Sequence, residues 1–303
     1  MRTTLLVAVF ALCPFAVWAG DSARVIVVDD DRVECPNADF TSIQAAVAAA
    51  EPGDRILVCA GTYHEQVTVP KDAISLLAKG KPGEVIIDAH GHGAGFLIQA
   101  ASDVTVEGFH IEGAHEADIL LVGATFATIR ENLATGAHHD GIELEFSNDN
   151  LIEHNVAIDN PEPNACGVNL TATSSRNTVR HNLLVNNEWG IQIAGAAQDN
   201  VIFHNESVHN RGNGIRNVGN SSGTVIDDNR AFSNGLTPGP LTGATAAGIR
   251  LGSGTAIVVA RNHAFENLAV DLRQDTAAAM FEDNHCNTSS PPGLCEHDEG
   301  NGH

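Results

Sequence analysis

The feature that most constrains this 303-residue sequence is a pair of repeats that run in phase along most of it. One repeat is an asparagine that recurs every 22 to 33 residues: Asn132, Asn155, Asn182, Asn205, Asn229, Asn262 and Asn284. A second asparagine follows most of these five positions later: Asn160, Asn187, Asn210, Asn234 and Asn267. The other repeat is a glycine before a β-branched residue: Gly141, Gly167, Gly190, Gly214 and Gly248. Repeats of this length indicate a solenoid.

A parallel β-helix explains both repeats. Each coil consists of short strands joined by turns, and successive coils stack about 4.8 Å apart, so equivalent residues lie directly above one another. A stacked asparagine can donate to and accept from the next one, and asparagine also tolerates the left-handed turn conformation. Glycine is expected to supply backbone freedom at a repeated corner. The sequence therefore predicts an all-β solenoid of about nine coils.

The two ends are predicted to differ from the repeats. Residues 1–20 have a positive start and a short apolar core, "LLVAVFALCPFAV", which is typical of a secretory signal. The segment "FTSIQAAVAAAEPGD" predicts a short N-terminal capping α-helix that opens with a capping box from Thr41 to Gln44. We expect four parts: a signal peptide (1–20), an N-terminal cap with the first strands (21–66), the repeats (67–285), and a C-terminal disulfide loop with an acidic tail (286–303). The insertion "GLTPGPLTGAT" is expected to be a loop.

A secreted or periplasmic location without a membrane span follows from the signal, and such compartments are oxidising. Within the ends of the chain we expect two disulfides, Cys35 with Cys59 and Cys286 with Cys295. Cys166 is then left over, and its simplest interpretation is a small buried core residue.

The formal net charge of −22 excludes one class of partner. Nucleic-acid binding relies on clustered cations, so no nucleic acid is expected. An acidic protein can bind neutral glycans, or acidic ones if Ca²⁺ bridges the two. We expect a monomer.

The segment "TSIQAAVAAAEPGDRILVCAGTYHEQVTV", the later "GFHIEG" and the asparagine and glycine coils resemble the pectin-lyase-like superfamily of secreted β-helix proteins. This resemblance covers nearly all of the mature chain and implies a right-handed parallel β-helix. The superfamily includes lyases, hydrolases, esterases, epimerases, phage tailspikes and non-catalytic adhesins, so the resemblance does not settle activity. The motifs of its polygalacturonases and pectin methylesterases are absent, and "HHDG" is at most distantly similar to the motif of its alginate epimerases.

Enzymes of this superfamily usually work on the outer face of the strand that follows the glycine corner. The residues predicted to point outward there are Leu97, Leu120, Glu143, Asn169, Gln192, Arg216, Arg250 and Asp271. The polar middle of this column suggests a groove for a polysaccharide, possible contacts being Asn169, Gln192 and Arg250. Trp189 is either an exposed sugar platform or a packed corner residue. A solvated strand face that binds nothing is the alternative.

The segment "HHDGIELE" (residues 138–145) admits several chemistries. His139 and Glu143 could act as base and acid, and Arg216 matches the arginine base that β-helix lyases use. Asp140 and Glu145, with Glu143, could hold Ca²⁺. The histidines with Glu143 could hold a transition metal. The simplest alternative is a solvated corner.

Three functions remain open. The first is a lyase or epimerase on an acidic polysaccharide, and the second is a non-catalytic glycan-binding or surface protein. The third is a periplasmic metal-handling protein that uses the column of His154, His181 and His204, since one related group consists of periplasmic accessory proteins for copper enzymes. The sequence favours the alternative that these histidines are turn residues that hydrogen-bond along the stack, because neighbouring coils carry other residue types in their place.

Overall fold

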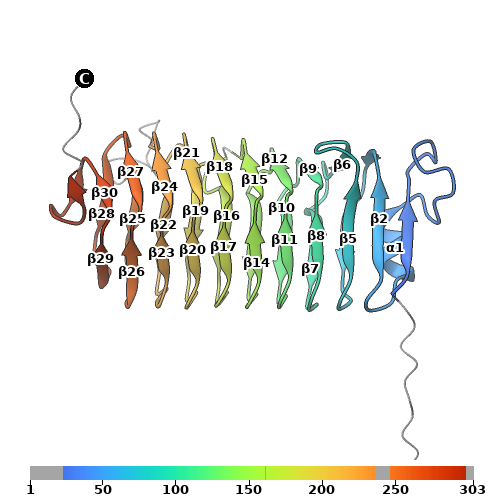
Figure 1. Cartoon of the computed structure of the whole chain (residues 1–303), viewed down its shortest axis with the longest axis horizontal. Helices are drawn as coiled ribbons and strands as arrows, with labels where there is room; N and C mark the ends of the chain where they lie inside the picture. Colours follow the sequence, from blue (N-terminus) through green and yellow to red (C-terminus); the bar gives the residue numbers. More distant parts are fainter. Residues whose placement is uncertain (1–22, 161, 236–245, 298–303) are drawn as a thin grey trace, which may run out of the picture.

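Three parallel sheets wind around one long axis in the computed structural model of this chain (Figure 1). The structure describes residues 23–160, 162–235 and 246–297. The expected signal peptide, residues 236–245 of the inserted loop and the tail from residue 298 lie outside the described residues.

Each sheet collects one strand from each coil in turn. The first sheet contains β1 (Val25–Val28), β2 (Arg55–Cys59), β5 (Ser75–Lys79), β8 (Thr105–Glu107), β11 (Thr128–Arg130), β14 (Leu151–Glu153), β17 (Thr178–Arg180), β20 (Val201–Phe203), β23 (Val225–Asp227), β26 (Ile257–Ala260) and β29 (Ala279–Glu282). The second contains β4 (Val67–Val69), β7 (Ala94–Gln99), β10 (Ala117–Val122), β13 (Asp140–Glu145), β16 (Cys166–Thr171), β19 (Trp189–Ile193), β22 (Ile215–Asn217), β25 (Ala247–Leu251), β28 (Val270–Gln274) and β31 (Ser289–Ser290). The third contains β3 (Gly61–Tyr63), β6 (Val85–Asp88), β9 (His110–Glu112), β12 (Leu133–Thr135), β15 (Val156–Ile158), β18 (Leu183–Val185), β21 (Glu206–Val208), β24 (Arg230–Phe232), β27 (His263–Phe265), β30 (His285–Cys286) and β32 (Glu296–His297).

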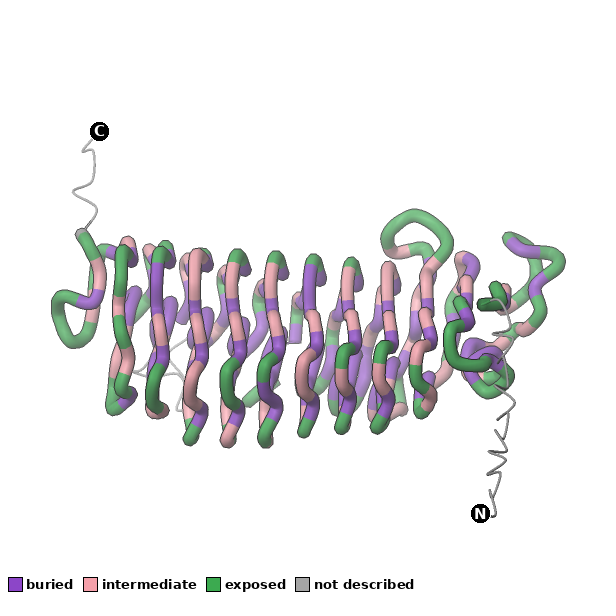
Figure 2. The backbone as a smooth tube through the Cα atoms, turned by 60° about the horizontal axis from the view of Figure 1, so that its bottom comes forward, coloured by how far each residue is buried: buried purple, intermediate pink, exposed green. Residues whose placement is uncertain are grey.

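The right-handed parallel β-helix is confirmed, with about ten coils instead of nine. Side chains alternate along each strand, so every second residue enters the core. Ile142 and Leu144 of β13 are fully buried, and Val168 and Leu170 of β16 lie in register with them in the next coil. The regular spacing of buried segments is visible along the tube in Figure 2.

The single helix of the described residues, α1 (Ile43–Ala49), covers the N-terminal end of the solenoid (Figure 1). Ile43, Ala46 and Val47 form its buried face. The predicted helix is present, but its capping box is wrong by one residue, because Ser42 is the N-cap and accepts from the Ala45 N–H. The Glu65 carboxylate accepts from two further N–H groups of the first turn, so a distant residue adds to the cap that Ser42 provides.

The asparagine ladders are continuous chains of buried hydrogen bonds. In the first ladder each side-chain amide donates to the next asparagine at 2.9–3.1 Å, from Asn132 to Asn284. The second runs from Asn160 to Asn267 at 2.9–3.2 Å. The left-handed conformation, with φ between 49° and 57°, belongs to the residue before each asparagine of the first ladder: Glu131, His154, His181, His204, Asp228, Arg261 and Asp283. Asparagine therefore serves at these positions through the hydrogen bonds of its side-chain amide, and the left-handed conformation does not explain it.

The repeated glycines have a different cause from the one expected. None of the five has a positive φ, so backbone freedom does not explain them. A Cβ atom at Gly141 would lie 2.8 Å from the carbonyl oxygen of Gly167, and one at Gly167 would lie 2.8 Å from that of Gly190. Stacked coils approach too closely here for any side chain.

Both expected disulfides are present, Cys35–Cys59 at the N-terminal end and Cys286–Cys295 at the C-terminal end. Cys166 is a buried free thiol. Within the described residues, no helix has the length and apolarity needed to cross a bilayer.

Candidate functional site

A polar pocket of about 350 Å³ lies against β13. It is lined by His115, Glu116, Leu120, His139, Glu143 and Glu145. His139 stands in the turn before β13, and Glu143 and Glu145 project from the outer face of the strand, since the residues between and beside them enter the core. One donor atom each from His139, Asp140 and Glu143 lies within 4.8 Å of the others. Glu145 lines the pocket outside this converging group.

Buried hydrogen bonds fix Asp140 beneath the pocket. Its Oδ1 accepts from the Cys166 backbone N–H at 2.6 Å, and its Oδ2 accepts from the Asn169 amide at 2.9 Å. The His139 Nδ1 lies 3.1 Å from the same Oδ2. This contact with Asp140 raises the pKa of His139 to about 8. Asp140 thus holds the imidazole in place from below.

Glu143 is the most perturbed carboxyl group that lines this pocket. Burial raises its pKa to about 8, and the charges of Asp140 and Glu145 raise it further, whereas protonated His139 lowers it. Only 9% of the residue is exposed. Two neighbouring groups therefore titrate near neutral pH, in surroundings where crowded negative charge favours a proton or a cation.

The outward column of the second sheet follows the predicted register from Leu97 to Arg250. Its polar groups are largely bonded to one another. Gln192 donates to Asn169 at 3.0 Å, and Asn169 donates to Asp140. Arg250 is paired with Asp275 at 2.7 Å. This part of the column has few uncommitted groups with which to contact a ligand.

The prediction that Asp271 ends this column is wrong. Arg250 pairs in register with Arg273, so Arg273 takes the expected place. Asp271 is buried, and its Oδ1 accepts from the amide of Asn267 at 2.9 Å. The second asparagine ladder ends at Asn267, and a buried amide donor needs an acceptor there.

Trp189 packs at its corner and is not an exposed platform. The indole is 5% exposed, and the guanidinium of Arg216 lies 3.7 Å from the centre of the ring. Burial lowers the pKa of Arg216. Glu143 and Arg216 are three coil steps apart, a separation of about 14 Å, so the two do not meet at one bond of a substrate.

Sequence reasoning missed a histidine column beside the pocket. His92, His115 and His138 occupy the same place in three successive coils, and the rings of the last two stack with centres 5.7 Å apart. With His90 and neighbouring glycines they line a further pocket of about 390 Å³. Each of the three stands two residues before the first residue of its strand. Extending the repeat of the glycines by two coils toward the N-terminus would have revealed this spacing in the sequence.

The predicted column of His154, His181 and His204 is present, and its rings stack. Ring centres are 4.9 Å apart at both steps, and the first pair is parallel within 4°. Metal coordination requires donor atoms that point toward one site, whereas parallel stacked imidazoles direct their nitrogen lone pairs side by side. Together with their left-handed turn conformation, this supports a packing role.

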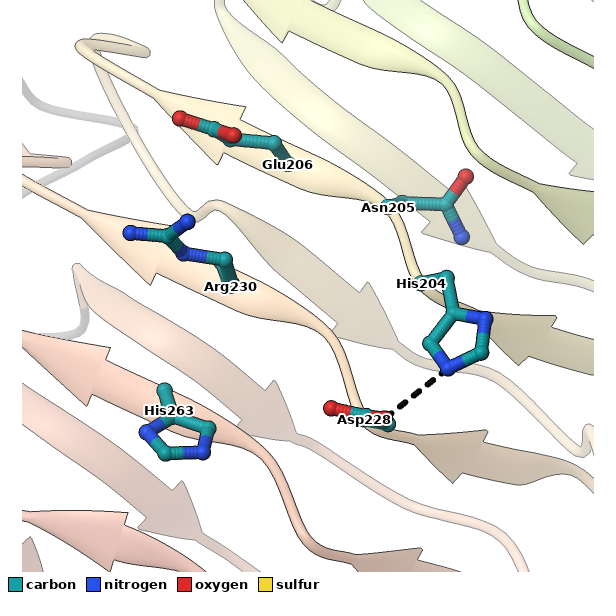
Figure 3. A pocket seen from close by; sticks show the side chains of 6 residues that line it. All are labelled: His204, Asn205, Glu206, Asp228, Arg230 and His263. Carbon is teal, nitrogen blue, oxygen red and sulfur yellow. Dashed lines mark hydrogen bonds and ion pairs between the residues drawn. The ribbon is translucent and has the colours of Figure 1, made fainter.

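The end of that column opens on a pocket of about 380 Å³, shown in Figure 3. It is lined by His204, Asn205, Glu206, Asp228, Arg230 and His263. The His204 Nε2 is 2.8 Å from an Asp228 carboxylate oxygen, the interaction that the figure marks. No three metal-donor groups of these side chains converge as those of β13 do.

A sequence family described as "Periplasmic copper-binding protein (NosD)" matches residues 77–245, more than half of the chain and all of the β13 pocket. The chain belongs to the NosD family. No curated protein matches the sequence.

Solved structures similar to this NosD-family chain share its fold at low sequence identity. The A-module of the Azotobacter vinelandii mannuronan C-5 epimerase AlgE4 has a TM-score of 0.56 and 15% identity, over 80% of this chain and 83% of the other. An alginate lyase from Paenibacillus sp. str. FPU-7 has a TM-score of 0.55 and 13% identity, over 91% of this chain and 96% of the other. The pectate lyase Pel9A has a TM-score of 0.52 and 16% identity, over 88% and 75%.

The donors at β13 fit copper in one oxidation state better than the other. Imidazole and carboxylate ligands suit Cu²⁺, whereas Cu⁺ prefers the sulfur of cysteine or methionine. The free thiol near the pocket is Cys166, and burial raises its pKa well above the usual value, which disfavours the thiolate ligand. The residues present therefore fit Cu²⁺.

Proposed function

We propose that this NosD-family chain is a periplasmic protein that binds a divalent transition-metal ion, Cu²⁺ first among them, at His139, Asp140 and Glu143. The observation that carries the proposal is the convergence of three donor atoms within 4.8 Å on the wall of a polar pocket. The description of the family supports copper as the metal. The two disulfides are compatible with an extracytoplasmic location.

The electrostatics of the pocket support a cation. Glu143 holds a proton near neutral pH because burial and the charges of Asp140 and Glu145 oppose its ionisation. A divalent ion would replace that proton and offset the same repulsion. Ca²⁺ at Asp140, Glu143 and Glu145 is less suited, because Ca²⁺ prefers an all-oxygen site and the converging group includes an imidazole.

The test is calorimetric titration of the purified protein with Cu²⁺, compared with Zn²⁺ and Ca²⁺. His139→Ala removes one donor from a half-exposed side chain, and we expect the tightest Cu²⁺ site to weaken at least about tenfold. The matched control is His181→Asn, which removes a stacked imidazole from a position where asparagine tolerates the left-handed backbone. We expect the control to keep the site.

Two results would contradict this assignment. Loss of tight binding in His181→Asn but not in His139→Ala would move the metal to the stacked column. Absence of any Cu²⁺ site that His139→Ala weakens would remove the copper proposal.

A second candidate is an enzyme acting on an acidic polysaccharide, a lyase or an epimerase. The observation that favours it is the adjacent pair His139 and Glu143, both with a pKa of about 8, which suits general acid–base catalysis. Similar folds include a mannuronan C-5 epimerase and an alginate lyase. Asn169, Gln192 and Arg250 remain candidate substrate contacts along the same sheet, and Arg216 would act there, away from the acid–base pair.

Incubation with alginate, pectate and glycosaminoglycans separates these roles, with ultraviolet detection of unsaturated uronates and product composition for epimerisation. Under the enzymatic proposal Glu143→Gln loses turnover and keeps polysaccharide binding. Binding without turnover in the unmodified protein would favour the non-catalytic glycan-binding role.

A further inference from the structure

Four acidic side chains converge near the N-terminal end of the solenoid, in the loop between β1 and α1. Asp29, Asp30, Asp31 and Glu34 each offer one carboxylate oxygen, and these oxygens lie within 4.8 Å of one another. No Arg, Lys or His in the described part of the chain forms an ion pair with any of the four. Among the described residues, these four carboxylates therefore repel one another without a paired cation to offset the repulsion.

Asp29 provides an independent indication of a ligand. The residue is 0% exposed, and its Oδ2 accepts from the backbone N–H of Cys35. Its Oδ1 is buried and has no hydrogen-bond partner. A buried carboxylate oxygen without a partner is costly, and such groups in folded proteins are usually satisfied by a donor, a water or an ion.

The loop is held in the conformation that gathers these oxygens. Asp30 accepts from the backbone N–H groups of Asp31 and Thr62, and Asp31 accepts from that of Val33. The Asp30 carboxylate packs against Gly61, where no Cβ atom would fit. These bonds fix the backbone and leave carboxylate lone pairs available.

The same loop is tied to the body of the solenoid. The Cys35–Cys59 disulfide links it to the end of β2. Tyr63 of β3 donates to the Cys59 carbonyl, and its pKa is raised by burial and then by the charge of Asp30. An ion at the cluster would therefore stabilise the N-terminal cap.

We propose that this loop binds one Ca²⁺ ion through Asp29, Asp30, Asp31 and Glu34. Ca²⁺ takes roughly six to eight oxygen ligands in flexible geometry, and the group contains oxygen donors alone. Mg²⁺ demands a stricter octahedron and retains its waters, so it competes poorly for four carboxylates. The site is separate from the β13 pocket and does not depend on the function proposed there.

The test is thermal unfolding of the full chain in EDTA, in Ca²⁺ and in Mg²⁺, with Ca²⁺ affinity from calorimetry. We expect Ca²⁺ to raise Tm by about 2 to 4 °C at ten times its Kd, and Mg²⁺ to raise it less. Asp31→Asn and Glu34→Gln change exposed side chains, so both should fold without Ca²⁺ and bind it at least about tenfold more weakly. Glu51→Gln removes an exposed charge outside the cluster and should bind Ca²⁺ normally.

Glu143→Gln distinguishes this site from the β13 pocket. Unchanged Ca²⁺ affinity in Glu143→Gln, with weakened affinity in Asp31→Asn and Glu34→Gln, supports the loop site. Loss of Ca²⁺ binding in Glu143→Gln alone would overturn it, as would the absence of any Tm rise in Ca²⁺ relative to EDTA. Full affinity in both loop variants would overturn it as well.

Discussion

At the scale of single residues, the crowding of carboxylates around Glu143 determines what the β13 pocket can do. Its side chain is buried beside Asp140 and Glu145, and neutral Glu143 is the form that these surroundings favour. A proton neutralises it up to about pH 8, and a metal ion could do so at higher pH. Proton and metal therefore compete for the same carboxylate.

The titration of this pocket predicts that the metal-free protein loses stability as pH rises. The pKa of Glu143 is raised from 4.5 to about 8 and that of His139 from 6.5 to about 8, so the folded state binds more protons than the unfolded state in this range. The free energy of unfolding then falls as pH rises. The stabilising contribution of Glu143 is complete below pH 4.5 and that of His139 below pH 6.5, and both are lost as pH rises through about 8. Thermal unfolding in EDTA across this range measures it.

Glu143→Gln keeps the shape of the side chain and removes its charge. We expect this variant to show a flatter dependence of Tm on pH than the unmodified protein, because only His139 then contributes from the pocket. An unchanged slope in the variant would show that Glu143 is ionised in the folded state at neutral pH.

At the scale of elements, the asparagine ladder sets the register of the coils. Each amide bonds along the stack as well as to backbone carbonyls, so a slipped coil would leave buried donors without acceptors. The positions of these asparagines were readable from the sequence because they recur. The left-handed residues before them were not, since Glu, His, Asp and Arg occupy those places and share no side-chain chemistry.

Asn205→Ala should destabilise the protein by about 2 to 4 kcal/mol. The side chain accepts from Asn182 and donates to Asn229 and to the Val179 carbonyl, and alanine would leave these buried groups unpaired. Asn220→Ala is the control, because that residue is exposed and should change stability by less than about 0.5 kcal/mol. Urea unfolding gives both values, and equal values would argue against the ladder as a source of stability.

The site was harder to predict than the fold because it depends on contacts between coils. Glu143 and His139 are close in sequence, and reasoning from their residue types brought them together. Arg216 of the next coil stacks on the buried ring of Trp189, and Asp271 accepts from the last asparagine of its ladder. Neither contact is visible until side-chain directions in neighbouring coils are known.

At the scale of the whole molecule, the chain is a row of coils in which each coil contacts its neighbours, so stability is close to a sum of local terms. The ends lack one neighbour, and each end carries a disulfide. Coils at the ends are consequently the ones whose opening should need least free energy, and the disulfides act where the stacking is incomplete.

Replacing Cys286 and Cys295 by serine should loosen the last coils and spare the centre. The bond closes a separation of nine residues beside β30 and β31, and its loss frees that segment without touching the middle ladder. Hydrogen exchange followed by mass spectrometry should show faster exchange in β28 to β32 and unchanged exchange in β14 to β21. The matched comparison is the Cys35 and Cys59 pair, whose replacement should affect only the first coils. Faster exchange throughout the chain in either variant would mean that the solenoid opens as one cooperative unit, because loss at one end would then reach coils that share no contact with it.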